Sequence, residues 1–278
     1  MRSFSHRAVL VTLATVALSF AGCGDSSDSE GGTDAPTIDA PSTATDAPSG
    51  VIDAPASTID GMTAPCTDPV FMTDDPNGGT SDSGYYIHNN MWNSDAGLGP
   101  ETLYACSYHN WYVVSNQTNN AGAVKTYPNV HKDYEDVPIS SFSSLTSRFA
   151  ETSPHVGIYD VAFDIWLNGV ATEGSTELMV WTDNYNQVPA GDQVATVTWD
   201  DRTYDVWRTS GGEYIAFVPA EPYTSGTFDI LEMFDWTVDQ GWLDADATVG
   251  QIGFGIEIVE TGGGDATFYV TDFAITEN

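Results

Sequence analysis

The sequence predicts an all-β sandwich with a single packed helix over residues 66–278. From Tyr85 onward, runs of β-branched and aromatic residues recur roughly every ten residues, separated by clusters of Gly, Asn, Asp and Pro, as is typical of such sandwiches. Within several runs apolar and other residues alternate, as in a strand with one buried face. A domain of this length can bury a substantial core.

Residues 1–22 have the form of an export signal. Two arginines precede an apolar stretch from Ala8 to Phe20, and small residues precede Cys23. The stretch is too short to span a membrane as a helix, so we expect no transmembrane segment in the mature chain. The Phe-Ala-Gly-Cys end resembles a bacterial lipoprotein cleavage site, which would make Cys23 a lipid-anchored first residue at the cell surface or outer membrane. A plain secretory signal is the alternative.

Residues 23–65 are expected to form a disordered linker. They are rich in Asp, Ala, Pro, Ser and Thr, and the triplet Asp-Ala-Pro begins at residues 34, 39, 46 and 53. Such a segment cannot bury enough apolar surface to fold. Its prolines and like charges favour an extended tether.

The net charge excludes several classes of partner. The chain has 40 acidic against 7 basic residues, a formal charge of −33. Nucleic acid and anionic membrane surfaces are therefore poor partners, whereas a neutral polysaccharide is not repelled. The charge itself is typical of a solvated, salt-tolerant surface.

Cys66 and Cys106 are the remaining cysteines besides Cys23. In an exported protein an isolated pair is typical of a disulfide rather than a metal site, and this one would tie the start of the domain to an early hairpin. No further ligands at zinc spacing accompany the pair, and no histidine lies in an HExxH pattern. We therefore expect no metal and no cofactor.

Strand-like runs cover much of the domain. They are residues 85–92, 108–115, 157–167, 176–182, 193–199, 202–209, 213–219, 250–259 and 267–276. In one other segment apolar residues from Phe228 to Val238 recur at helical spacing. Ser225 or Thr227 could cap the start of this helix, and Gly241 is placed to end it.

One glutamate faces away from the core in the run 250–259. Because side chains alternate between the faces of a strand, the apolar residues at even positions would line the core and Glu257 would face the other way. Gly253 and Gly255 share the face of Glu257. We expect them to leave room for something to lie on the sheet.

A second glutamate is expected on the same kind of face in the run 176–182. Alternation there buries Leu178 and Val180 and places Glu177, Met179 and Trp181 on the open face. A carboxylate, a thioether and an indole together suit a sugar.

Two further runs extend this face. Alternation in the run 157–167 leaves Asp164 and Trp166 opposite the core. In the first run of the domain it places Asn90 and Trp92 together, an amide and an indole suited to bonding hydroxyls and stacking on sugar rings.

Paired carboxylates are what hydrolysis of a glycosidic bond requires. The oxocarbenium-like transition state needs one acid to protonate the leaving oxygen and one carboxylate on the opposite face of the ring. Neighbouring like charges separate the two pKa values, so one glutamate keeps its proton while the other is ionised. The alternative is that these acids are solvated surface and that Trp92, Trp166 and Trp181 are core or edge aromatics.

At these residues the chain resembles glycoside hydrolase family 12, the compact endoglucanases. Glu177-Leu-Met-Val-Trp181 is similar to the family's Glu-(Ile/Leu)-Met-Ile-Trp nucleophile motif, and Val188-Pro-Ala-Gly191 to the Pro-Ile-Gly that follows it. Asn89-Asn-Met-Trp92 resembles an Asn-Asn-Leu-Trp segment, and Val161-Ala-Phe-Asp164 resembles a Val-Ala-Tyr-Asp strand. The motifs keep the family's order across most of the domain.

The resemblance implies a β-jelly-roll of two curved antiparallel sheets with a cleft on the concave face, retaining chemistry and no metal. By position, Glu177 would be the nucleophile, Glu257 the acid/base, and Asp164 the neighbour that supports the nucleophile. The expected glucan contacts are Asn90, Trp92, Met179, Trp181 and Pro189.

The chain departs from the family after the second glutamate. The family has Gly-(Thr/Phe)-Glu-Pro-aromatic, whereas Ile258 and Val259 follow Glu257 here, which bears on the leaving-group subsites. Glu260 is a competing acid/base, although alternation from Ile256 points it to the core unless a bulge intervenes.

The expected function is a retaining endo-β-1,4-glucanase, exported and monomeric, that acts on cellulose-like, mixed-linkage or xyloglucan polysaccharides. The departure at Ile258 and Val259 motivates an alternative, a surface glucan-binding module with little or no catalysis. A structural surface domain without sugar affinity is a third hypothesis. The aromatic residues of the face argue against it, because exposing them without a ligand lowers solubility.

Overall fold

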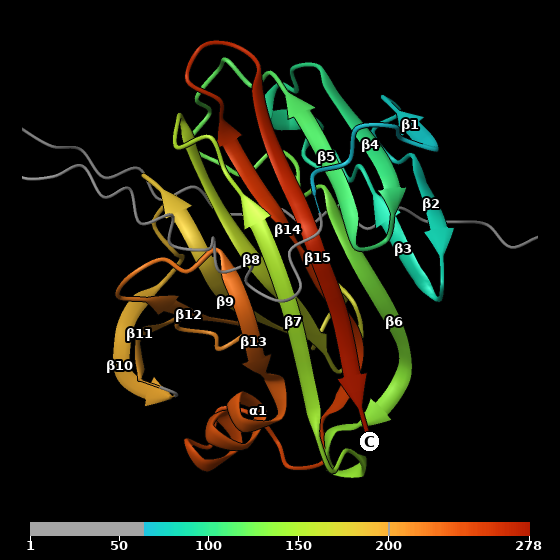
Figure 1. Ribbon diagram of the computed structural model, residues 1–278. Coiled ribbons are helices and arrows are strands. Elements are labelled where there is room, and N and C mark those ends of the chain that lie inside the picture. The colour runs from blue at the N-terminus through green and yellow to red at the C-terminus, as the bar shows by residue number, and fades with distance from the viewer. Residues whose placement is uncertain (1–63, 200) are drawn as a thin grey trace, which may run out of the picture. The chain divides into compact units, whose positions relative to one another are not determined.

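The β-branched and aromatic runs form the strands of two packed sheets (Figure 1). The structure is a computed structural model that describes residues 64–199 and 201–278. The expected export signal, Cys23 and the linker up to residue 63 lie outside the described residues. Within the described part of the chain, no helix is long and apolar enough to cross a membrane.

The smaller sheet has six strands, which pair in antiparallel fashion. In spatial order they are β1 (Phe71–Thr73), β4 (Glu101–Ser107), β5 (Asn110–Ser115), β15 (Ala266–Glu277), β7 (Leu145–Thr152) and β13 (Ser225–Asp229).

The larger sheet has nine strands, of which β12 and β9 pair in parallel and the other neighbours are antiparallel. In spatial order they are β10 (Asp192–Trp199), β11 (Arg202–Arg208), β12 (Tyr214–Pro219), β9 (Thr176–Tyr185), β8 (Ile158–Leu167), β14 (Thr248–Glu260), β6 (Asn129–Pro138), β3 (Tyr85–His88) and β2 (Gly79–Asp82). Two short 3₁₀ turns, η1 (Ser94–Ala96) and η2 (Ile139–Ser141), complete the elements besides α1. The prediction of an all-β sandwich is confirmed.

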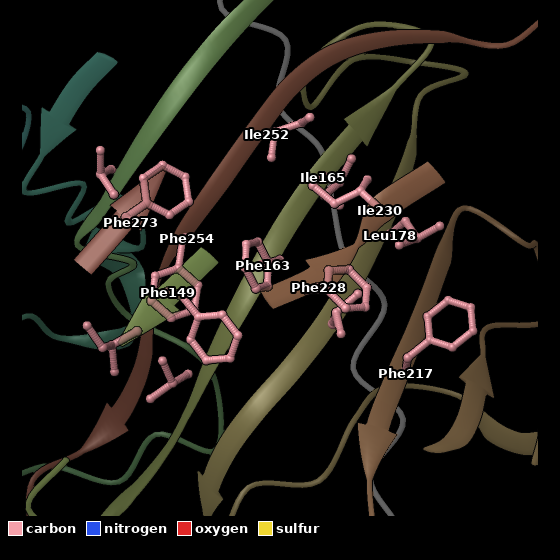
Figure 2. Packing of buried hydrophobic residues seen from close by; sticks show 14 of the residues in the cluster. Phe149, Phe163, Ile165, Leu178, Phe217, Phe228, Ile230, Ile252, Phe254 and Phe273 are labelled. Carbon is pink, nitrogen blue, oxygen red and sulfur yellow. The ribbon is translucent and has the colours of Figure 1, made fainter. Parts of the chain in front are cut away.

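The core lies between the sheets, where alternation brings apolar side chains of both together. Figure 2 shows Phe149 of the smaller sheet beside Phe163 and Phe254 of the larger one, with ring centroids 5.4 and 5.2 Å from Phe149. The side chains expected to face the core from β8, β9 and β14, among them Ile165, Leu178 and Ile252, are buried here. The other face of the nine-stranded sheet is thus free to carry a site.

Helix α1 (Ile230–Asp239) follows β13 and covers the core face of the outer strands of the larger sheet (Figure 1). Its Trp236 packs against Trp199 of β10 and Phe217 of β12, with ring centroids 5.8 and 5.5 Å apart. The helix therefore covers the part of the nine-stranded sheet that extends beyond the six-stranded sheet.

The ends of α1 correct one prediction and confirm another. The cap is Asp229, whose Oδ1 accepts a hydrogen bond from the Glu232 amide at 3.0 Å, whereas Ser225 and Thr227 lie in β13, so the predicted cap was wrong. Gly241 ends the helix as predicted, with φ of +69°.

Two strands are clearly shorter than predicted. The run 85–92 is a strand only to His88, because Asn90 adopts φ of +43°, which breaks extended geometry. The run 108–115 starts as a strand at Asn110, since Tyr108 and His109 form the turn after β4.

The disulfide is present as expected. Cys66 and Cys106 are joined with a Cα–Cα distance of 5.7 Å. Cys106 lies in β4 just before the turn to β5, so the bond ties the start of the domain to this hairpin.

Candidate active site

The three acids singled out in the sequence lie on one face of the larger sheet. We call the face opposite the core the site face. Glu177 is on β9, Asp164 on the adjacent β8 and Glu257 on β14, which pairs with the other edge of β8. Each alternates with core residues of its strand, as predicted.

The register places β8 between the two glutamates. Glu177 stands opposite Trp166, and Glu257 stands opposite Asp160. Asp164 lies on the same face of β8 between these positions. Both glutamates are half-buried, whereas Asp164 is buried. A ligand over this part of β8 would have one glutamate on each side.

The pKa values of these acids are raised. Burial, followed by the charge of Asp164, raises the pKa of Glu177 to about 8. Burial and the charge of Glu257 raise the pKa of Asp164 to about 8, opposed by a hydrogen bond that Trp166 Nε1 donates to Asp164 Oδ2 at 3.1 Å. Burial, then the charges of Asp160 and Glu177, raise the pKa of Glu257 well above its ordinary value. Each carboxyl disfavours the charge of another, so they titrate as one group.

Asp160 is a fourth carboxyl that sequence reasoning missed. It is fully buried, and burial raises its pKa well above the usual range. The signal was available, because Asp160 precedes Asp164 by four residues on the same strand and alternation gives both the same face.

Two tyrosines stand next to the carboxyls and were also missed. After burial, the charges of all four carboxyls raise the pKa of Tyr127 and Tyr214 further. Tyr127 donates a hydrogen bond to the carbonyl of Ala162 at 3.1 Å, and Tyr214 pairs with Glu177 across β12 and β9. Alternation against the buried Ile215 would have placed Tyr214 on the site face.

Met179 and Trp181 are on the predicted face but are covered, each 1% exposed. They form a second apolar cluster with Ala162 and Ala216, against which Trp207 and Tyr214 pack. The two side chains therefore form the floor of the site face, and their expected contact with a glucan stays a prediction.

The other expected glucan contacts lie in loops. The carbonyl of Asn90 accepts a hydrogen bond from the Tyr127 amide at 3.0 Å, which places the segment after β3 beside the acids. Trp92, two residues on, is 54% exposed. Pro189 is half-buried in the loop that joins β9 to β10.

The glycines of β14 accommodate this chain's own backbone. A Cβ on Gly255 would lie 2.3 Å from the carbonyl oxygen of Pro128, and one on Gly253 would lie 3.6 Å from the Tyr127 hydroxyl. The expectation that both leave room for a ligand was therefore wrong for Gly255, because the segment 127–129 occupies that space.

The competing acid Glu260 lies elsewhere. A bulge between Ile258 and Glu260 interrupts the alternation, and the charge of Glu260 acts on Lys125. Ile258 and Val259, the departure from the family motif, are buried. In residues 64–199 and 201–278, no group of three or more His, Cys, Asp or Glu is arranged to hold a metal ion.

The chain is similar to several known proteins. The family model described as glycosyl hydrolase family 12 matches residues 83–278. The chain is 27% identical over 211 residues to endoglucanase A of Aspergillus kawachii, covering 70% of this chain and 87% of the relative. It is 27% identical over 220 residues to endoglucanase S of Pectobacterium parmentieri, covering 69% and 81%. The solved xyloglucanase domain of NopAA from Sinorhizobium fredii matches with a TM-score of 0.64 and 26% identity, covering 76% of this chain and 100% of that domain.

Proposed function

The chain belongs to glycosyl hydrolase family 12, and on that premise we propose that it is a retaining endo-β-1,4-glucanase with Glu177 as nucleophile and Glu257 as acid/base. Its sandwich is the β-jelly-roll of that family. The observation that carries the proposal is the pair of half-buried glutamates that flank β8 on one face, where the charge of Glu177 helps to raise the pKa of Glu257.

Double displacement assigns a step to each glutamate. The Glu177 carboxylate attacks the anomeric carbon while Glu257 gives its proton to the leaving oxygen, which forms a glycosyl ester on Glu177. The Glu257 carboxylate then takes a proton from the water that attacks the same carbon, and Glu177 is released. Two inversions return the starting configuration.

The protonation states that this mechanism needs follow from the coupling. A proton on the buried Asp164 removes the charge that raises the pKa of Glu177, so Glu177 ionises more readily when Asp164 is neutral. The Trp166 indole fixes Asp164 in place through its hydrogen bond. We therefore propose that Asp164 supports the nucleophile.

The identity of the substrate polymer is a separate part of the proposal. The relatives named above include endoglucanases and a xyloglucanase. We propose an internal β-1,4-glucan bond as the common target, with the exposed Trp92, together with Asn90 and Pro189, contacting sugar units. A polymer panel of carboxymethyl cellulose, mixed-linkage glucan and xyloglucan distinguishes these substrates.

Release of reducing sugar from soluble β-glucan tests the activity. The wild type should release it, and Glu177→Gln should lower the rate by at least about a thousandfold, because an amide cannot form the ester. Glu173→Gln is a matched control, since Glu173 is an exposed residue in the loop before β9.

Equal rates for the wild type and Glu177→Gln would overturn the assignment. Retardation of the wild type in a glucan gel without turnover would instead support the binding module.

We also propose that the protein is exported. The Cys66–Cys106 disulfide suits an oxidising compartment. Intact-mass measurement of a membrane fraction tests lipidation of Cys23.

A further inference from the structure

Asp160 is the cross-strand neighbour of the proposed acid/base and has no established role. The residue is 0% exposed. On β8 it stands opposite Glu257 of β14 on one side and opposite Asn184 of β9 on the other. Burial of an acid at this depth requires a partner, because an isolated buried charge is strongly unfavourable.

The carboxyl that faces Asp160 is that of Glu257, its cross-strand neighbour on β14. Within the described part of the chain, no N–H or hydroxyl group donates to either oxygen of Asp160. Two carboxyl groups can share a hydrogen bond only when one of them carries a proton. A proton on Glu257 would therefore give Asp160 the hydrogen bond that its buried oxygens lack.

We propose that Asp160 is a positioning residue for the proton-donating step: its carboxylate accepts the hydrogen bond of Glu257 and keeps the proton on Glu257 until the leaving oxygen takes it. The inference rests on the proposed function, because it assigns a donor role to Glu257. When the proton moves to the leaving oxygen, Glu257 becomes the carboxylate that later deprotonates water.

The surroundings of the pair favour a proton on it. The titratable groups that face it are Glu177 from β9, Asp164 from β8, Tyr127 from the segment before β6 and Tyr214 from β12. The charges of the carboxyls Glu177 and Asp164 oppose ionisation of the pair, whereas the raised pKa values of both tyrosines keep them neutral. A hydrogen bond donated by Glu257 to Asp160 would raise the pKa of Glu257 and lower that of Asp160, which favours the proton on Glu257.

Asp160→Asn tests the proposal with a side chain of nearly the same shape. The amide would donate to the Glu257 carboxylate and remove a negative charge, and both changes favour ionised Glu257. We expect the alkaline limb of kcat/KM to move down by about one pH unit or more.

Substrates with different leaving groups distinguish a role of Asp160 in positioning the acid from a purely structural role. Phenyl β-cellobioside needs a proton on its leaving oxygen, whereas 2,4-dinitrophenyl β-cellobioside does not. At pH 7 Asp160→Asn should lower kcat/KM at least about tenfold for the first substrate and change it by less than about twofold for the second. An equal fall for both substrates, or an unshifted pH profile, would overturn the proposal.

Asp183→Asn is the matched control. Asp183 is a buried aspartate of β9 whose carboxylate pairs with His155 at 3.2 Å, and it is absent from the groups that face Glu257. The control should keep the wild-type pH profile. If the wild type hydrolyses no glucan or glucoside, the proposed function fails; if it is active and Asp160→Asn behaves like Asp183→Asn, only the role of Asp160 fails.

If Asp160→Asn does not fold, a measurement on the wild type tests the proposed role of Asp160 instead. Titration of protein with ¹³C-labelled carboxyl groups should show Asp160 and Glu257 as a coupled pair with two shared steps. In Glu257→Gln the Asp160 signal should lose the step that it shares with Glu257. An Asp160 titration that is the same in both proteins would contradict the inference.

Discussion

Buried carboxyls outside the site obey the same electrostatics as those within it. Glu101 is 3% exposed on β4, and its Oε1 accepts a hydrogen bond from the Thr126 hydroxyl at 2.6 Å. Burial raises the pKa of Glu101 from 4.5 to about 7, although hydrogen bonds from Thr126, Ser115 and Gln117 lower it. The folded protein therefore binds this proton more tightly than the unfolded chain does.

Glu101→Gln should flatten part of the pH dependence of stability. Because the folded-state pKa is raised, the contribution of Glu101 is fully present below about pH 4.5 and is lost as the pH rises through about 7. The free energy of unfolding of the wild type should fall relative to that of the variant by up to about 3 kcal/mol over this range.

Urea denaturation at pH 4.5, 6 and 8 measures this difference. Glu135→Gln, on an exposed position of β6, serves as the control and should run parallel to the wild type. Parallel curves for Glu101→Gln and the wild type would show that Glu101 does not keep its proton on folding.

At the scale of elements, the site depends on a crossing segment as much as on the strands. Residues 127–129 lead into β6 and lie against β14, where Asn129 Nδ2 donates a hydrogen bond to the Tyr127 carbonyl at 2.6 Å. Because Gly255 has no side chain, this segment can approach β14 closely. The close approach brings the Tyr127 hydroxyl near the four carboxyls.

Gly255→Ala should therefore disturb both stability and activity. The added Cβ would lie 2.3 Å from the Pro128 carbonyl oxygen, so the backbone has to move. We expect a loss of about 1–3 kcal/mol in the free energy of unfolding and a lower kcat, because Tyr127 shifts away from the acids.

Thermal unfolding and β-glucan hydrolysis check this change together. Gly264→Ala is the control, since a Cβ at Gly264 would meet no atom within 4 Å. If Gly255→Ala unfolds at the wild-type temperature and keeps full activity, the segment 127–129 does not depend on that glycine.

The elements also show how far the sequence predicts the fold. Strands β8, β9 and β14 were predicted within a few residues because apolar side chains alternate along them against one core. Strands β1, β2, β4, β6, β7 and β13 were missed. Edge strands such as β1 and β2 have no strong alternation, and β6 carries charged residues over much of its length.

The faces of Glu177, Asp164 and Glu257 followed from alternation alone, whereas the burial of their neighbours did not. Asp160 lies on the same face, but its pairing with Glu257 depends on the register between β8 and β14, which no single strand pattern contains. Met179 is covered because Trp207 and Tyr214 come from β11 and β12.

At the scale of the whole molecule, the larger sheet packs against the core with one face and carries the carboxyl site on the other. Its central strands contribute to the main core through one set of side chains and to the carboxyl site through the other. Apolar clusters on both sides of β8 and β9 hold their backbones in place, which fixes the acids they carry. A formal charge of −33 is compatible with an uncharged glucan as the ligand of this face.

The covalent intermediate tests the central claim most directly. The wild type would be incubated with 2,4-dinitrophenyl 2-deoxy-2-fluoro-β-cellobioside, digested, and the labelled peptide sequenced by mass spectrometry. We predict one fluorocellobiosyl group on the peptide that contains Glu177, bound at that residue, and no label in Glu177→Gln. A label on another residue, or active wild type that inverts the anomeric centre and forms no adduct, would contradict the double-displacement account.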